Sequence, residues 1–304
     1  MAARTSGRLG KWLVSGPPLL YLTFFFAIPT LIMVLASFRT PGEFGGLAPF
    51  VDEAGNLDLN VESYARFFEE PVYAEVFLKS VGYALVTTFF CLLLAYPLAA
   101  LIATSSKRHR NLLLLLVILP FWSNFLIRIY AWMIILGPQA ALARSVNAAL
   151  AAFGQEPVSL LFSSFAVLVC LVYVHLPFMV LPLYANLEKH DQTLLDAAQD
   201  LGANAWQRFW RITFPLSLPG VYAGAALVFI PALGIFAIPD ILGGPDDSLI
   251  GNVIKQQFLE TRDWPFGSVL SIVLTVAALV LAGLAAWVGR RNLGNPSSAA
   301  AVDA

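Results

Sequence analysis

The stretch DQTLLDAAQDLGANAWQRFWRITFPLSLP, residues 191–219, is the most informative part of the chain. It is a polar island between long apolar segments. Asp191 or Thr193 can cap the start of a helix, because both side chains accept hydrogen bonds from free backbone N–H groups. Gly202 can take the positive φ that ends a helix, and Pro215 cannot continue one. The stretch therefore predicts a small helix, a glycine turn and a second helix that stops at a proline.

The second predicted helix has two interpretations. Asn204 can cap it, and Trp206, Phe209 and Trp210 lie along it. One interpretation is an amphipathic segment at the membrane surface, whose tryptophans join an aromatic belt. The other is a docking surface, because small alanines on the first helix allow another protein to approach closely. A docking loop of this kind predicts that the chain is one subunit of a multi-protein assembly.

Composition places most of the chain in lipid. It has 304 residues, of which 59% are hydrophobic and 12% charged, with a mean hydropathy of +0.75. Soluble domains carry about 25% charged residues. The net charge of −1, without a basic stripe, gives no support to nucleic-acid binding. Cys91 and Cys170 lie in apolar segments, which argues against a disulfide framework. His109, His175 and His190 lack metal-ligand spacing, so no metal site is predicted.

Six apolar segments are long enough to cross a bilayer core, which takes about 20 helical residues. The first is too long for the apolar part of a signal peptide, about 7–15 residues, so we expect it to be retained. The expected spans are 16–38, 80–104, 112–136, 164–187, 218–242 and 267–289. Lipid offers backbone groups no partner, so each must be helical and the fold class is an all-α polytopic membrane protein. The predicted organisation is an N-terminus of 1–15, a six-span domain of 16–289 with an outer loop 39–79 and a loop 188–217, and a tail of 290–304.

The lysines and arginines predict the orientation of these spans. With the N-terminus in the cytoplasm, eleven basic residues fall on that side, namely Arg4, Arg8, Lys11, Lys107, Arg108, Arg110, Lys189, Arg208, Arg211, Arg290 and Arg291. Six fall outside, namely Arg39, Arg66, Lys79, Arg144, Lys255 and Arg262, and Arg128 lies within a span. Both termini and the 188–217 loop are therefore predicted to be cytoplasmic.

The spacing within the island resembles a known signature. An acidic-Ala-Ala group is followed after three residues by Gly and after nine more by Ile-x-apolar-Pro, at positions Asp196, Ala197, Ala198, Gly202, Ile212 and Pro215. It resembles the signature of ATP-binding-cassette (ABC) importer permeases, in which this loop forms the coupling helices that sit in a groove of the ATPase subunit. The family usually has Glu where this chain has Asp196 and Leu where it has Phe214. Asp is one methylene shorter, so the contact geometry differs while the implied docking role stays.

Other stretches resemble the permeases of spermidine/putrescine importers. They are residues 120–122 with 126–132, 176–184, and 250–254 with 262–267, and the resemblance runs from about 80 to 290. It implies the type I, MetI-like importer fold in the bacterial inner membrane, a second permease subunit, two ATPase subunits and an extracytoplasmic solute-binding protein. The chain itself is implied to be non-catalytic and to bind no cofactor, with ATP-Mg on the partner ATPases. Consistently, the sequence contains no G-x-x-x-x-G-K-[ST] loop.

Some residues are candidates for the translocation path or its neighbourhood. Arg128 is an intramembrane charge that either satisfies backbone carbonyls, pairs across helices or borders the path. Asp240 lies where prolines and glycines can open a helix, and it either caps a loop or attracts a cation. Tyr130, Trp132 and Tyr184 either pack in the core or offer cation–π contacts.

Three alternatives remain beside a polyamine importer. The same kind of permease can carry another small cationic or amino-acid-like solute. A stand-alone secondary transporter or channel would need coupling-ion sites or a selectivity ring, and neither is evident. A membrane enzyme would need a convergent acid, base or nucleophile, whereas the charges lie mostly in loops.

Overall fold

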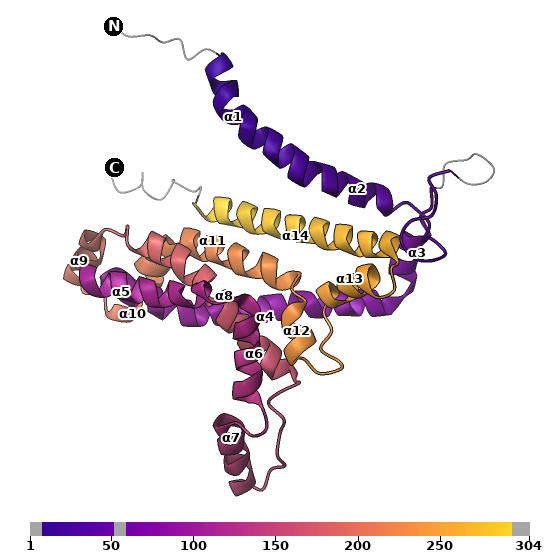
Figure 1. The fold of residues 1–304 in the computed structure, drawn as a ribbon. Coiled ribbons are helices and arrows are strands. Elements are labelled where there is room, and N and C mark those ends of the chain that lie inside the picture. The colour runs from indigo at the N-terminus through magenta and orange to yellow at the C-terminus, as the bar shows by residue number, and fades with distance from the viewer. Residues whose placement is uncertain (1–7, 52–58, 294–304) are drawn as a thin grey trace. The chain divides into compact units, whose positions relative to one another are not determined.

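The computed structural model describes residues 8–51 and 59–293, and within these ranges it is mostly helical. The predicted termini lie partly outside them, as do residues 52–58 of the 39–79 loop. In the described ranges β pairing is limited to an isolated bridge between Pro41 and Leu47. The elements are α1 Arg8–Leu22, η1 Thr23–Ala27, α2 Ile28–Ala36, α3 Glu62–Glu69, α4 Pro71–Thr104, α5 Lys107–Ile118, η2 Leu119–Trp122, α6 Phe125–Leu136, α7 Ala141–Ala152, α8 Ser164–Leu187, α9 Gln192–Asp200, α10 Ala205–Arg208, η3 Phe209–Thr213, α11 Phe214–Leu233, α12 Ala237–Leu242, α13 Ile250–Leu259 and α14 Trp264–Leu293 (Figure 1).

Six helical stretches in the described chain are long and apolar enough to cross a membrane, which confirms the predicted all-α, six-span fold. They are Val14–Ala36, Pro71–Thr104, Phe125–Ala152, Ser164–Leu187, Ala205–Leu233 and Trp264–Leu284. The fourth matches its predicted bounds. The second begins earlier than predicted, because α4 starts at Pro71, inside the predicted 39–79 loop.

The third predicted span, 112–136, is not one helix. It is interrupted by η2 and by an extended Ser123 (φ −88°, ψ 152°), and α6 then leaves α5 in a new direction (Figure 1). Pro120 lies in η2, and the Asn124 side chain accepts the Leu126 N–H at 2.8 Å as the cap of a new helix. A cap residue inside an apolar run starts a second helix there.

The fifth span begins within the predicted 188–217 loop, and Pro215 does not end a helix. The elements α10, η3 and α11 follow one another without a gap from Ala205 to Leu233. In the π-helical turn η3 the Phe214 N–H bonds to the Phe209 carbonyl, five residues back. In a regular α-helix a proline ring clashes with the carbonyl four residues before it. The wider π turn moves the backbone away from that position, so the helix continues through Pro215.

The end of this span is broken where the sequence predicted that the helix could open. α11 stops at Leu233, and α12 is a separate short helix that starts at Ala237. Gly234 follows the last residue of α11. The predicted span 218–242 therefore consists of two helices, with the break in the region where prolines and glycines indicated that the helix could open.

Packing divides the chain into two compact units. The first comprises residues up to 74 together with 253–275. In it, Arg66 of α3 donates to Asp263 Oδ2 at 3.2 Å and to the Tyr73 hydroxyl at 2.9 Å, and its guanidinium lies 4.3 Å from the centre of the Phe266 ring. Phe266 is fully buried. Arg66 thus joins α3 to the beginning of α14.

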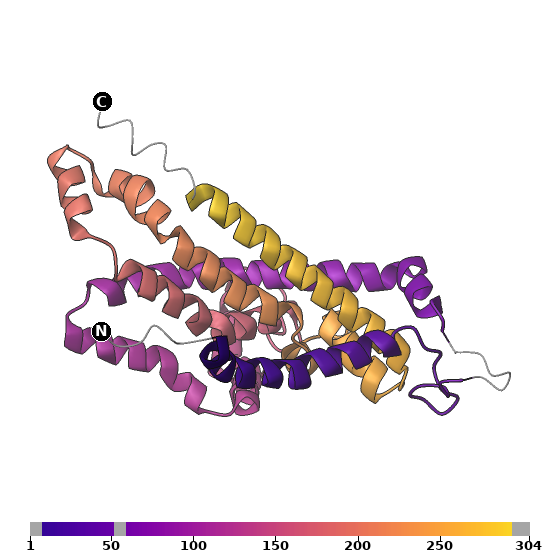
Figure 2. The ribbon, with the colours of Figure 1, turned by 90° about the horizontal axis from the view of Figure 1, so that it is seen from above.

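The second unit, residues 75–252 and 276–304, is organised around α8, which contacts α5, α6, α11 and α12. Figures 1 and 2 show α8 and α11 side by side. Gly220 and Gly224 of α11 face α8, and a Cβ added at them would lie 2.8 Å from Asn186 Cβ and 2.6 Å from Met179 Sδ. Small residues four apart let two helices approach closely, which is a common packing mode in membranes.

Two buried clusters flank α8 in this unit. One joins α4, α8 and α11 through fully buried side chains such as Cys91, Met179 and Val228. The other joins α6, α8 and α12 through Ile129 and Ile238 among others. α8 therefore serves both clusters.

Candidate functional site

The 188–217 segment contains two capped helices joined by a glycine turn. Asp191 caps α9 by accepting the Thr193 N–H at 3.0 Å, and this bond holds the pKa of the Asp191 carboxyl below its usual value. Asn204 and Gln207 form a reciprocal capping box on α10, with bonds of 2.9 and 3.0 Å. Of the two candidate caps for the first helix, Asp191 is the cap and Thr193 lies within the helix, and the predicted cap Asn204 is confirmed.

The turn between the two helices has a defined geometry. Gly202 has φ +82°, which a glycine adopts without strain. The Ala203 N–H bonds to the Ala198 carbonyl at 2.9 Å. Across the turn Arg208 donates to Gln199 Oε1 at 2.7 Å. The segment is therefore a small helix pair held by its own hydrogen bonds.

The structure brings together part of the predicted signature. Ala198, Gly202 and Ile212 line one hollow of about 410 Å³, with Arg208 and Arg211 also on its wall. The hollow combines small side chains with two guanidinium groups. It lies on the helix pair itself.

The other signature residues are exposed on either side. Asp196 and Ala197 are exposed on α9, and Pro215 is exposed in the first turn of α11. Leu201 is 90% exposed at the turn.

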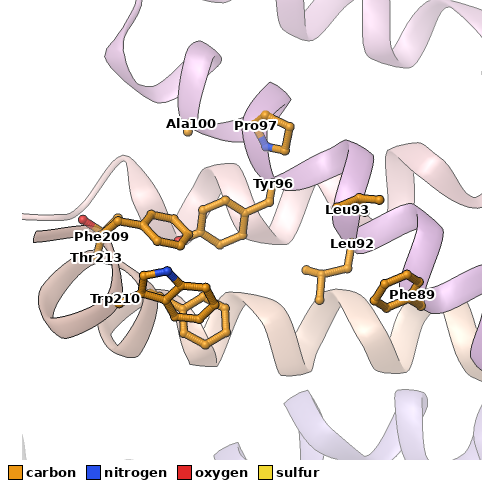
Figure 3. A pocket seen from close by; sticks show the side chains of 10 residues that line it. Phe89, Leu92, Leu93, Tyr96, Pro97, Ala100, Phe209, Trp210 and Thr213 are labelled. Atoms are coloured by element: carbon orange, nitrogen blue, oxygen red, sulfur yellow. The ribbon is translucent and has the colours of Figure 1, made fainter. Parts of the chain in front are cut away.

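Directly behind this helix pair, η3 packs against α4 through aromatic rings. Tyr96 lies 5.5 Å from Phe209 and 6.1 Å from Phe214, measured between ring centroids. Figure 3 shows Tyr96 pointing from α4 toward Phe209, with Trp210 beside them. These rings border a cavity of about 560 Å³ between α4 and η3, which we call the α4–η3 cavity. No local sequence pattern indicates this cluster, because Tyr96 lies far from its partners along the chain.

The four candidate path residues do not form one cluster. Asp240 is exposed on α12 and accepts a hydrogen bond from Asn252. Tyr130 is 47% exposed on α6. Trp132 is half-buried against Tyr173, with ring centroids 5.5 Å apart.

Tyr184 lies toward the opposite end of α8 from Asp240. The first turn of α8 meets α12 through the Ser163 N–H bond to the Leu242 carbonyl, at 3.3 Å. Tyr184 is 21 residues further on than Ser163, roughly 30 Å along a helix. Of the four, Asp240 and Tyr130 are the exposed ones, so they are the better placed to meet a solute.

Arg128 lies among aromatic rings. Its guanidinium carbon is 5.3 Å from the centre of the Phe121 ring and 5.7 Å from that of Phe125. Its Nε is buried and has no hydrogen-bond partner among the described residues. The two cation–π contacts compensate part of the cost of placing this charge in a span.

Sequence reasoning missed the importance of Asp247, which is 5% exposed. Its carboxylate accepts hydrogen bonds from the Tyr83 hydroxyl at 2.8 Å, the Ser164 hydroxyl at 2.5 Å and the Gly244 N–H at 2.9 Å. Burial raises the pKa of Asp247, but these three bonds and the nearby charge of Lys79 outweigh burial and hold it below its usual value. One carboxylate thus ties the turn after α12 to α4 and α8.

The described residues contain no group of three or more His, Cys, Asp or Glu side chains that could hold a metal ion. The features that stand out are instead a membrane-spanning helical core, an exposed helix pair between two spans, and a broken fifth span. Together they define a polytopic helical membrane protein, with the architecture expected of a transport permease.

The comparisons with known proteins give the family. The chain belongs to the binding-protein-dependent transport system inner membrane components, whose family model matches residues 72–293. It is therefore a multi-pass inner-membrane protein, and a transport component rather than an enzyme.

The chain is similar to the spermidine/putrescine transport system permease protein PotB of Haemophilus influenzae, with 43% identity over 263 residues, covering 86% of this chain and 87% of that protein. It is 45% identical to PotB of Escherichia coli over 258 residues, covering 84% and 89%. A crystal structure of a bacterial ABC transporter that imports the acidic polysaccharide alginate has the same fold, with a TM-score of 0.67, 20% identity and coverage of 94% and 99%. The predicted family and importer-permease fold are confirmed.

Proposed function

We propose that this chain is the transmembrane permease subunit of an ATP-driven ABC importer that moves polyamines, spermidine and putrescine, into the cytoplasm. The observation that carries the proposal is the similarity to PotB proteins along most of both chains. The alginate importer shares the fold at lower identity, so fold alone does not specify the cargo.

The proposed assembly contains this chain, a second permease subunit, two ATPase subunits that bind ATP-Mg, and an extracytoplasmic solute-binding protein. The family description supports a binding protein in general. The bias of lysine and arginine toward one set of loops supports cytoplasmic N- and C-termini and a cytoplasmic 188–217 segment.

The ATPase docks on the helix pair of the 188–217 segment in this proposal. Its hydrogen-bonded turn and the Arg208–Gln199 bond let α9 and α10 move as one piece. The exposed Leu201 and the hollow lined by Ala198 and Gly202 supply apolar and small-residue contact area. The continuous helix from Ala205 into α11 carries a displacement of the pair directly into the fifth span.

The cation passes Asp240 on its way. This carboxylate is exposed beside the break between α11 and α12, where backbone and charge can face water rather than lipid. Tyr130 offers an exposed ring for a cation–π contact, and Trp132 and Tyr184 are candidates of the same chemistry. Arg128 would repel a polyamine, so it belongs beside the path rather than in contact with the solute.

The test is uptake of labelled spermidine and putrescine by proteoliposomes that contain the whole complex. Ala198→Arg and Gly202→Asp should abolish both uptake and the stimulation of ATPase activity by the loaded binding protein. Gly154→Asp is the matched control, because Gly154 also has a positive φ, +71°, and open space around its Cβ position. Uptake that survives both helix-pair variants would exclude docking there. Asp240→Asn should reduce uptake, and unchanged transport would remove Asp240 from the path.

The same assay separates the alternatives. A complex that takes up an amino-acid-like solute and ignores polyamines would keep the class and change the cargo. Uptake by this chain alone, driven by an ion gradient, would indicate a stand-alone transporter.

A further inference from the structure

The contact between Tyr96 of α4 and the beginning of α11 has a directional hydrogen bond at its centre. The Ser217 hydroxyl donates to the Phe214 carbonyl at 2.8 Å. Its proton is therefore committed, so the Tyr96 hydroxyl is the donor in their 2.9 Å contact. Ser217 is fully buried, which makes this bond one that water does not replace.

The ring of Tyr96 adds contacts to the π-helical turn. It meets Phe209 edge-on, with an interplanar angle of 78°, and lies tilted at 38° to Phe214. Phe209 is the first residue of η3 and Phe214 the first of α11. Tyr96 therefore touches both sides of the irregular turn between the helix pair and the fifth span.

Each of the two helices is weakened where Tyr96 joins them. Pro97 follows Tyr96 inside α4 and removes one helical N–H bond. On the other side, η3 replaces regular α-helical bonding by the five-residue bond from Phe214 to Phe209. Kinks in helices occur at prolines and π turns. The bond thus connects two sites at which the helices can bend.

The contacts of Tyr96 with Phe209 and Phe214 border the α4–η3 cavity, which separates part of α4 from η3. Its lining includes Leu92 and Leu93 on one side and Trp210 on the other (Figure 3). A filled interface would move as a block through many contacts. The Tyr96 hydroxyl bond and its ring contacts lie at the edge of this hollow of about 560 Å³, and they join α4 to η3 and α11 there.

We propose that Tyr96 is a positioning residue for coupling: it passes displacement of the 188–217 segment from α11 to α4, so that two spans respond to the ATPase together. This inference rests on the proposed function. Without the Tyr96–Ser217 bond, ATP hydrolysis continues while fewer solute molecules move per ATP.

The experiment measures solute transported per ATP hydrolysed in the reconstituted complex with its binding protein. Tyr96→Phe and Ser217→Ala remove the same bond from its two sides, so one remains informative if the other fails to assemble. Each should lower the ratio roughly fivefold, the factor expected for one neutral hydrogen bond. The double variant should lose no more than either single one, because the bond can be lost only once. The binding-protein concentration for half-maximal uptake should stay unchanged.

The chain supplies a matched control in its other compact unit. The Tyr64 hydroxyl contacts Ser37 Oγ at 2.8 Å, Ser37 donates to the Val34 carbonyl at 2.7 Å, and Ser37 is also fully buried. Tyr64→Phe and Ser37→Ala remove the same kind of bond from a unit that does not contain the helix pair. They should leave the transport ratio unchanged.

Three outcomes overturn the inference. An unaltered ratio in Tyr96→Phe and Ser217→Ala would show that the bond does not couple. An equal loss in the control pair, or losses that multiply in the double variant, would show a general structural effect. If the unaltered complex takes up polyamines with ATP but Tyr96→Phe and Ser217→Ala do not lower the transport ratio as predicted, the proposed function stands and the coupling role of Tyr96 is wrong. If the unaltered complex shows no ATP-dependent uptake, both fall.

Discussion

Replacing Asp247 by Asn should destabilise the protein although it changes only one atom of the side chain. The carboxylate presents Oδ1 to the Tyr83 and Ser164 hydroxyls and Oδ2 to the Gly244 N–H. An amide keeps one acceptor oxygen. If that oxygen serves the two hydroxyls, the NH₂ group faces the Gly244 N–H, and two donors oppose each other.

The magnitude follows from the count of donors left without an acceptor. One buried donor costs about 1–3 kcal/mol, so we expect about 2 kcal/mol for Asp247→Asn. Asp247→Ala removes all three bonds and should cost about 3–5 kcal/mol. On the scale of soluble domains of about 150–250 residues, 2 kcal/mol lowers Tm by about 4–8 °C.

The assay is thermal unfolding of the purified protein in detergent between pH 7 and pH 3. The pKa of Asp247 is lowered in the folded state, so its contribution is fully present above the unfolded pKa of about 3.9 and is lost as the pH falls through the folded pKa. The difference in Tm between the unaltered chain and Asp247→Asn should therefore be constant from pH 7 to about pH 5 and shrink toward pH 3.

Asp246→Asn is the control, because the Asp246 side chain is exposed and its hydrogen bond to Lys79 uses the backbone carbonyl. It should change stability by less than about 0.5 kcal/mol. If Asp247→Asn shifts Tm no more than Asp246→Asn, or if the difference grows as the pH falls, the reasoning about the buried carboxylate is refuted.

Three further predictions concern packing, charge and the turn. Gly220→Ala places a Cβ 2.8 Å from Asn186 Cβ and should lower stability in thermal unfolding by about 1–3 kcal/mol. Gly82→Ala has open space around the new Cβ and should be neutral or stabilising, so equal effects of the two variants would contradict the packing argument. Arg110→Ala should lower stability by no more than about 1 kcal/mol despite the 2.5 Å ion pair with Glu188, because both side chains are partly exposed, and a larger loss would show that the pair is effectively buried. Gly202→Ala should lower the free energy of unfolding by about 1–2 kcal/mol, because alanine is strained at a φ of +82°, and Gly202→Asn should lower it less. Thermal melts followed by circular dichroism that rank the two variants in the opposite order would refute the turn geometry.

The sequence predicted the number of spans and the capped helix pair well, because both depend on local patterns. Apolar length gives the spans, and Asp191 and Asn204 are side chains whose capping geometry is local. The Gly202 turn was likewise predictable, because positive φ selects glycine.

The two broken or extended spans were mispredicted for physical reasons. The apolar run through span three hides the break, although Pro120 and the capping residue Asn124 were available as signals. Pro215 indicated a helix end, but the π turn before it lets the helix continue. Hydropathy alone does not report either event.

The long-range contacts could not be predicted from one sequence. Tyr96 with Ser217 and Asp247 with Tyr83 are pairs separated by 121 and 164 residues. Their partners are set by how α4 packs, which no local pattern encodes. The signature residues, by contrast, lie in one short segment with fixed spacing, so a single sequence is enough to propose them.

The central claim, an ATP-driven polyamine permease, is tested most directly by uptake of labelled spermidine and putrescine into proteoliposomes of the complete complex. Accumulation should require the binding protein together with hydrolysable ATP, and a non-hydrolysable analogue should give none. Polyamine accumulation by this chain alone, or an intact complex that hydrolyses ATP and excludes both polyamines, would contradict the account.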